Sequence, residues 1–138
     1  MRQLYAYLLQ QRFIDRDVLD AFTKRGMIYE SCEKSRAGTK EYHNAVFVGS
    51  DEYGAARHAH KRSLYTQGNS FRRNVEGGDP RCSFHWFGNS GRLYVFEAPI
   101  DLLAFLTLYP EAWREHSYVA LCGTSEQAML WMLEKDPR

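Results

Sequence analysis

Residues 92–138 contain two short apolar runs, each followed by a helical pattern, and this order constrains the fold more than any other feature. The first run ends at Glu97, and a helix pattern opens at Pro99, a residue favoured in the first helical turn. The second run, residues 117–123, leads into a predicted helix over residues 124–135 with a capping-box start. Near-continuous apolar strands that alternate with helices are typical of a parallel sheet covered on both faces.

Residues 1–91 show a different pattern, in which two short helices precede several short strands. The spacing of leucine and tyrosine predicts a helix over residues 2–12. A second helix is expected between Asp15, a good N-cap, and Gly26, a good C-terminal stop. Strands are expected over residues 27–33, 42–50, 55–63 and 82–88, with a hairpin turn at 51–54. We therefore predict an α+β part over residues 1–91, followed by an incomplete α/β, Rossmann-like part over residues 92–138.

The composition limits which partners and which cellular surroundings are expected for the chain. The formal net charge is +1, so any nucleic-acid affinity must come from a local basic patch. The three cysteines are far apart and form no CxxC pair, which predicts reduced thiols in a cytoplasmic protein. The chain has no signal-peptide pattern, and no apolar run approaches the ~20 residues that a membrane helix needs, so no membrane contact is expected.

Two carboxylates mark the junction after the first apolar run. Glu97 closes the predicted strand, and Asp101 lies one helical turn farther on. Ligands of open α/β sheets bind beyond the carboxyl ends of the strands, and Mg²⁺ prefers one or two carboxylates with water and phosphate oxygens. The alternative is that both acids only stabilise the start of the helix, and the pattern alone favours this interpretation.

A resemblance to a known family favours the metal site over the helix-start interpretation. The segment LYVFEAPIDLLAF, followed by YVALCGTSEQAMLWML, resembles the opening of a Toprim domain, the nucleotidyl-transfer and phosphodiester-cleavage module of DnaG-type primases and topoisomerases. Upstream, HNAVFVGSDEYGAARHAHKR resembles the segment that precedes Toprim in primases. The whole chain is similar to a primase-like family of bacterial plasmids and conjugative elements. The resemblance implies that Glu97 and Asp101 are catalytic residues and ligands of Mg²⁺ or Mn²⁺, and that Gly123 and Thr124 form a phosphate loop.

The chain departs from the Toprim pattern after its second helix. Toprim domains carry a later Asp-x-Asp motif, whereas this sequence ends in EKDPR, and the zinc module common at the start of DnaG-type primases is also absent. Two-metal phosphoryl chemistry needs several carboxylates. We therefore expect a central excerpt of a longer protein, with metal-dependent phosphoryl transfer in the intact parent and no catalysis by this chain alone.

The segment RHAHKR, residues 57–62, supplies a basic strand. Strand alternation places its side chains on two faces, and aromatic residues at 71 and 85–87 offer stacking surfaces for single-stranded bases. The alternative is a solvated edge strand. No tight spacing supports a zinc site at the two histidines of this segment. With the resemblance, we predict that the nucleic-acid contacts are Arg57, His58, His60, Lys61, Arg62, Arg72 and Arg81.

These observations predict a nucleic-acid-binding part of a primase-like Toprim protein that acts in DNA replication or mobilisation. The expected partners are single-stranded DNA or an RNA/DNA template, and other replication or mobilisation proteins. The alternative is a non-catalytic nucleic-acid-binding or protein-interaction module. Since an incomplete parallel sheet leaves an exposed edge, self-association is also expected.

Overall fold

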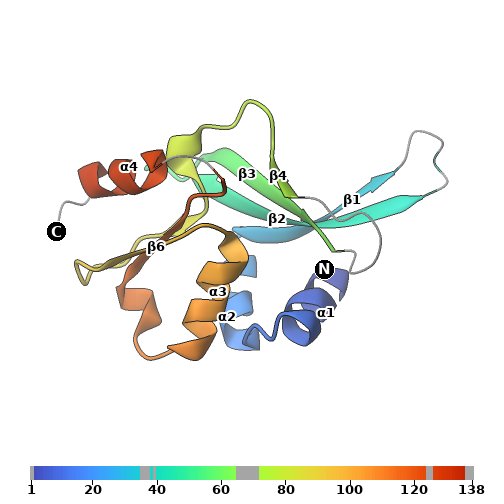
Figure 1. Ribbon diagram of the computed structural model, residues 1–138, viewed down its shortest axis with the longest axis horizontal. Helices are drawn as coiled ribbons and strands as arrows, with labels where there is room; N and C mark the ends of the chain where they lie inside the picture. Colours follow the sequence, from blue (N-terminus) through green and yellow to red (C-terminus); the bar gives the residue numbers. More distant parts are fainter. Residues whose placement is uncertain (1, 35–37, 39, 65–71, 124–125, 136–138) are drawn as a thin grey trace.

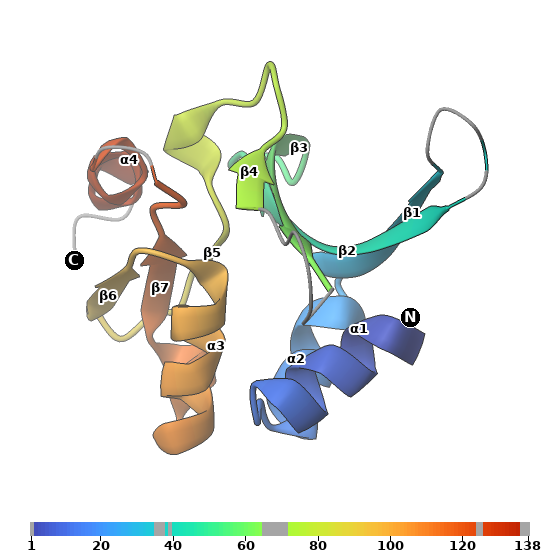
Figure 2. The same cartoon turned by 45° about the vertical axis from the view of Figure 1, so that its right-hand side comes forward.

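The computed structural model describes residues 2–34, 38, 40–64, 72–123 and 126–135. Two sheets stand side by side, and the helices α1, α2 and α3 gather on one side of them (Figures 1 and 2). The architecture is α+β, and it places the second sheet close to the last strands of the first.

The N-terminal helices follow the sequence prediction closely. Helix α1 (Arg2–Ala6) runs directly into a π-helical turn, η1 (Tyr7–Gln11), so the predicted helix over residues 2–12 is present with one wider turn. Helix α2 (Arg16–Thr23) is capped by Asp15, whose side chain accepts hydrogen bonds from the backbone N–H groups of Asp17 and Val18. Gly26, with φ +71°, turns the chain toward the first strand, as predicted.

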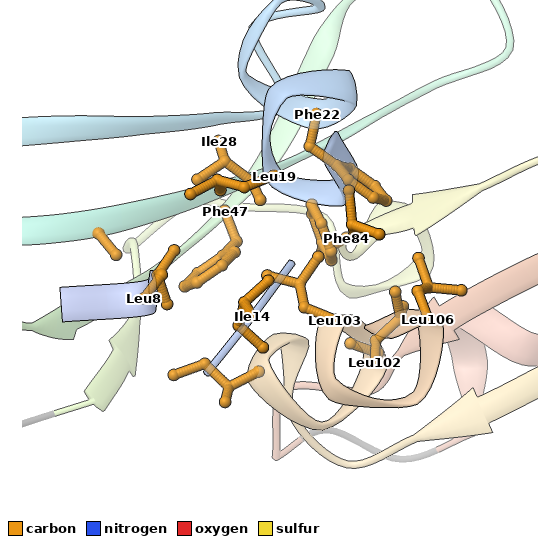
Figure 3. Close-up of a cluster of buried hydrophobic side chains, with 14 of the residues drawn as sticks. Leu8, Ile14, Leu19, Phe22, Ile28, Phe47, Phe84, Leu102, Leu103 and Leu106 are labelled. Carbon is orange, nitrogen blue, oxygen red and sulfur yellow. The ribbon is translucent and has the colours of Figure 1, made fainter. Parts of the chain in front are cut away.

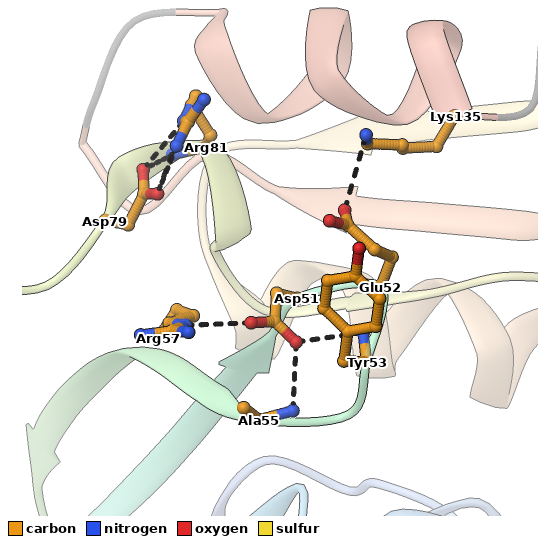
Figure 4. Close-up of polar contacts among 8 residues, drawn as sticks. All are labelled: Asp51, Glu52, Tyr53, Ala55, Arg57, Asp79, Arg81 and Lys135. Atoms are coloured by element: carbon orange, nitrogen blue, oxygen red, sulfur yellow. Dashed lines mark hydrogen bonds and ion pairs between the residues drawn. The ribbon is translucent and has the colours of Figure 1, made fainter.

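The first sheet is antiparallel, in the order β1-β2-β3-β4. The tight turn between β2 and β3 matches the predicted hairpin. Its first residue, Asp51, accepts hydrogen bonds from the N–H groups of Tyr53 and Ala55, and Gly54 has φ +82° (Figure 4). The strands are β1 (Ile28–Lys34), β2 (Glu41–Ser50), β3 (Ala56–Ser63) and β4 (Arg72–Asn74).

The second sheet has three strands in the order β5-β7-β6. Strand β6 (Leu93–Phe96) runs parallel to β7 (Ser117–Ala120), as predicted. Strand β5 (His85–Trp86) is antiparallel to β7, so the sheet is mixed rather than parallel throughout. This strand is also shorter than the predicted strand 82–88, because Pro80–Cys82 form the 3₁₀ turn η2 and do not extend it.

Helical segments connect and follow the two parallel strands of the second sheet. Helix α3 (Pro99–Leu108) follows β6, the 3₁₀ turn η3 (Trp113–Glu115) precedes β7, and α4 (Gln127–Lys135) follows it. The predicted start of the last helix, at residues 124–125, lies outside the described residues. No helix in the described part of the chain is long and apolar enough to cross a bilayer.

One hydrophobic core joins both predicted parts of the chain (Figure 3). The ring of Phe22 packs at 5.3 Å from that of Phe84 and stacks at 5.6 Å on that of Trp113, between ring centroids. Phe47 of β2 meets Phe84 edge-on at 5.4 Å. The backbone oxygen of Phe84 also accepts the N–H of Ala120 of β7 at 2.9 Å, so Phe84 contacts both sheets. The strand that follows it, β5, completes the second sheet from the first part of the chain.

Candidate metal and phosphate groove

The parallel pair β6 and β7 ends at one edge, and backbone hydrogen bonds continue two residues past the strands. The N–H of Leu121 donates to the oxygen of Phe96 at 2.8 Å, and the N–H of Cys122 donates to the oxygen of Glu97 at 2.8 Å. Glu97 is therefore held beside the turn that contains Gly123, whose φ is +76°. Parallel pairing thus brings the acid after one strand next to the glycine after the other.

Glu97 and Asp101 line one wall of a groove of about 570 Å³. Both side chains are exposed, and neither has a hydrogen bond or an ion pair within the residues that the structure describes. Helix α3 begins after Ala98 without any side-chain cap. The groove, rather than the end of the helix, is the surface that these carboxylates share.

The other wall comes from the first sheet. Arg72, Arg73 and Asn74 of β4 line the same groove, together with His60 of the neighbouring strand β3. The side chain of Arg72 lies on the same face of β4 as Asn74, so one guanidinium group faces the space that two carboxylates border from the other sheet. A groove with this charge distribution suits a ligand that carries an anionic group and a bound cation together.

Asn74 ties the two walls together. Its side-chain N–H donates to the backbone oxygen of Cys122 at 3.0 Å, so its amide oxygen is left to accept from Nδ1 of His60 at 2.7 Å. Burial lowers the pKa of His60, the Asn74 hydrogen bond opposes this, and the positive charges of Arg72 and Arg62 add to the lowering. A neutral imidazole whose Nδ1 donates keeps Nε2 as a hydrogen-bond acceptor.

The groove collects part of the predicted site. His60, Arg72, Glu97, Asp101 and Gly123 all line it. Thr124, the other predicted phosphate-loop residue, lies outside the described residues. The assigned roles of these residues remain predictions, whereas their proximity is a feature of the fold.

The remaining basic residues of the prediction lie outside this groove, and the arginines among them pair with protein groups, as Figure 4 shows for Arg57 and Arg81. Arg57 binds Asp51 at 2.8 Å, and Arg81 binds Asp79 at 2.9 Å. Two more basic residues of β3 also have protein partners. Lys61 pairs with Glu33 of β1, and the Arg62 guanidinium donates to the hydroxyl of Tyr7 at 3.1 Å. His58 is only 5% exposed, and neither of its ring nitrogens has a hydrogen-bond partner among the described residues.

Two of the aromatic residues predicted to stack on bases are buried, so the prediction is wrong for them. Trp86 packs between Phe22 and Trp113, and His85 packs edge-on against Trp131 of α4. The reason is that β5 pairs inside the second sheet, where both of its side chains face packed layers. Phe87, the next residue, is 40% exposed, and residue 71 lies outside the described part.

Asn74 is a groove residue that the sequence did not single out. Nothing local distinguishes it, because its position depends on the pairing of β4 with β3 and on the approach of the second sheet. The sequence feature that could have indicated this residue is the polar run RRN between two glycine-containing turns.

Two family models match the chain. Residues 6–90 match the model described as "Protein of unknown function (DUF3991)", and residues 94–137 match the model described as "Toprim-like". Neither a curated protein nor a solved structure matches the chain. The Toprim-like segment contains Glu97, Asp101 and Gly123, whereas His60 and β4 lie in the first match, so the groove is built at the junction of the two.

Proposed function

The chain belongs to the family described as "Protein of unknown function (DUF3991)", and from that premise we propose that its groove binds a divalent cation together with a phosphate group of a nucleic acid. The Toprim-like segment indicates a nucleic-acid-related function of the primase or topoisomerase type. The finer proposal is that single-stranded DNA, or an RNA/DNA template, supplies the phosphate.

One observation carries this proposal: Glu97 and Asp101, without protein partners in the described part, share a groove with Arg72. Exposed carboxylates that bind no protein cation fit Mg²⁺ or Mn²⁺, since such ions are held by one or two carboxylates and keep water and phosphate oxygens as their other ligands. Arginine is suited to bind phosphate oxygens through two parallel hydrogen bonds. The opposed charges thus match the two components of a cation–phosphate ligand.

Each lining residue has a proposed role. Glu97 and Asp101 hold the cation, and Arg72 orients the phosphate. Gly123 allows the backbone after β7 to approach a phosphate closely. His60, held by Asn74, offers Nε2 to a hydroxyl or a water molecule at the buried end of the groove.

The proposed reaction, to which this groove contributes, is phosphoryl transfer in DNA replication or mobilisation. An attacking oxygen forms a new bond to phosphorus, and the leaving oxygen departs with the electron pair of the broken bond. The bound cation supplies charge stabilisation for the phosphate oxygens. The contribution of this chain's residues is to bind and align the phosphodiester beside the two carboxylates.

The test is binding rather than turnover. We expect Mn²⁺ to bind the chain, measured by its paramagnetic effect on water relaxation, and Mg²⁺ to strengthen binding of a fluorescent single-stranded DNA oligonucleotide. Glu97→Gln and Asp101→Asn should each weaken Mn²⁺ binding about tenfold or more, since each removes one carboxylate from the site.

Glu111→Gln is the matched control, because this exposed acid follows the opposite end of α3, about 15 Å of helix away from the groove. It should bind Mn²⁺ and DNA like the parent chain. Equal Mn²⁺ affinity in Glu97→Gln, Asp101→Asn and Glu111→Gln would overturn the proposal.

Self-association is a second candidate role, favoured by the position of β6. This strand is at the edge of the second sheet, and Val95 at its centre is 40% exposed. An unpaired strand edge is a template for pairing with another chain. Sedimentation at increasing concentration tests it, and Val95→Lys should reduce any dimer found, since charged residues blunt edges.

A further inference from the structure

A second group of metal-ligating side chains lies on the first sheet, away from the groove. Cys32 of β1 and His43 of β2 are direct cross-strand partners, and Glu41 precedes His43 by two residues, which places it on the same face. Their ligand atoms, Sγ, Nε2 and a carboxylate oxygen, all lie within 4.8 Å of one another. Figure 1 shows that the outer part of the β1–β2 hairpin projects away from α3 and α4.

The spacing of these atoms matches a tetrahedral ion. The Sγ of Cys32 lies 3.8 Å from Nε2 of His43, and the Glu41 carboxylate oxygen lies 3.7 Å from the same nitrogen. Tetrahedral Zn²⁺, with its usual bond lengths, would separate sulfur from nitrogen by about 3.6 Å and nitrogen from oxygen by about 3.4 Å. The remaining pair, Sγ of Cys32 and the Glu41 oxygen, lies within 4.8 Å, so rotations of these two exposed side chains about His43 would bring all three ligands onto one ion.

His43 is already oriented for this role. Its Nδ1 lies 2.6 Å from an oxygen of Glu30, and the other oxygen of Glu30 accepts the backbone N–H of Leu4 at 2.8 Å. A carboxylate only accepts, so Nδ1 of His43 carries the proton and Nε2 presents its lone pair toward Cys32 and Glu41. Histidine ligands of metals are held in this way, by a carboxylate on the second ring nitrogen.

Glu30 is itself kept in the charged state. Burial favours its neutral form, but the hydrogen bonds from the Leu4 backbone and from His43 outweigh burial and lower its pKa. Helix α1 and the first sheet thus fix the carboxylate that orients His43, and the exposed side chains of Cys32 and Glu41 adjust to the ion.

We propose that Cys32, Glu41 and His43 form a zinc site on the β1–β2 hairpin, with Glu30 as the positioning residue of His43. A thiolate, an imidazole and a carboxylate are all ligands of Zn²⁺, and the thiolate disfavours Mg²⁺ and Ca²⁺. Three protein ligands leave one position of a tetrahedral ion for water or for a group of a bound molecule.

The other two cysteines do not compete for the ion. Cys82 and Cys122 are buried, and burial raises the pKa of both thiols, that of Cys122 to about 12. Their thiolate forms, which metals require, are therefore disfavoured at neutral pH. Cys32 is exposed at the surface of the sheet.

The experiment titrates the intact reduced chain with Co²⁺ as a spectroscopic substitute for Zn²⁺. A thiolate-to-cobalt charge-transfer band should appear, saturate at one ion per chain and disappear when Zn²⁺ is added. Cys32→Ser should abolish the band and lower Zn²⁺ affinity about a hundredfold or more. Glu30→Gln should keep the band but lower the affinity about 10–100-fold, the usual effect of losing an orienting carboxylate.

Two controls separate this site from the groove and from misfolding. Glu97→Gln should leave the cobalt band unchanged, so failure of the zinc site and failure of the proposed function give different results. In the parent chain, Zn²⁺ should protect Cys32 from alkylation, and EDTA should restore the reaction. A band that persists in Cys32→Ser, or alkylation of Cys32 that Zn²⁺ does not slow, would overturn the assignment.

Discussion

The side-chain amide of Asn74 donates to the backbone oxygen of Cys122 at 3.0 Å, and this bond joins the edge of the first sheet to the turn that follows β7. Asn74→Ala removes it and also leaves the Nδ1 of buried His60 without its acceptor. We expect a loss of about 1–3 kcal/mol in the free energy of unfolding, the usual cost of an unsatisfied buried group, measured by urea denaturation.

Asn74→Asp is a second variant, which keeps an acceptor for His60 but places a carboxylate oxygen against the backbone oxygen of Cys122. It should also be less stable than the parent chain, because two acceptors then face each other. Unfolding curves of Asn74→Ala that superpose on those of the parent chain would show that the junction does not depend on this residue.

Arg72 and Arg81 were both predicted to contact nucleic acid, and the structure separates them. Arg72 lines the groove, whereas Arg81 forms an ion pair with Asp79 at 2.9 Å. If the groove binds DNA, Arg72→Gln should weaken binding of single-stranded DNA about tenfold and reduce the slope of log affinity against log salt by about one. Arg81→Gln should change neither quantity. Fluorescence anisotropy over a salt series measures both, and equal losses in the two variants would contradict the assignment of the groove.

Buried histidines make the stability depend on pH. Burial is the largest cause of a lowered pKa in His58, His60 and His85, from an ordinary value of 6.5. His58 also faces the opposing influences of His60, which lowers its pKa, and of Asp79, which raises it. Below pH 6.5 the unfolded chain therefore binds more protons than the folded chain, so stability is full above this value and falls as the pH decreases through it.

The urea midpoint should accordingly be lower at about pH 5.5 than at about pH 7.5. The carboxylates with a lowered pKa stop stabilising the fold only as the pH falls below the ordinary pKa values, 4.5 for Glu30 and 3.8 for Asp51. A loss of stability between about pH 7.5 and about pH 5.5 therefore comes from the histidines. His58→Leu should flatten the dependence between the two pH values. Equal midpoints of the parent chain at both values would refute the histidine explanation.

Gly49 marks a close approach of two backbone segments. A Cβ atom at this position would lie 1.7 Å from the backbone oxygen of Cys82, so Gly49→Ala must displace the η2 segment. We expect a loss of at least about 3 kcal/mol in thermal or urea unfolding, at the upper end of overpacking effects. Gly77→Ala is the comparison, because a Cβ there meets no atom within 4 Å and only its φ of +83° opposes the change, at about 1–2 kcal/mol. A smaller loss for Gly49→Ala than for Gly77→Ala would contradict the steric argument.

Local signals explain which parts of the fold were predictable. Asp15 and Gly26 delimit α2, and Asp51 and Gly54 delimit the β2–β3 turn, because each acts on residues next to it in the chain. The order β6, α3, β7 was also predictable, since an apolar run, a helix-starting proline and a second apolar run follow one another.

Long-range packing explains what was missed. The antiparallel placement of β5 rests on two residues, too few for a pattern, and it buries Trp86. Arg57 looked available for phosphate, but the turn brings Asp51 within 2.8 Å of it. The presence of Asn74 in the groove depends on the register of β4 with β3 and on the contact between the sheets, neither of which a local pattern encodes.

The placement of β5 has a consequence for any attempt to dissect the chain. Its residues precede position 91, yet the one strand that they pair with in the described part of the chain is β7, on the far side of the boundary between the two matched family models. A cut at that boundary would leave β7 with one neighbour and would expose the aromatic surface around Phe84 to water. Neither segment should therefore fold stably when it is produced alone. Genetic recombination that keeps the fold would have to exchange both segments together.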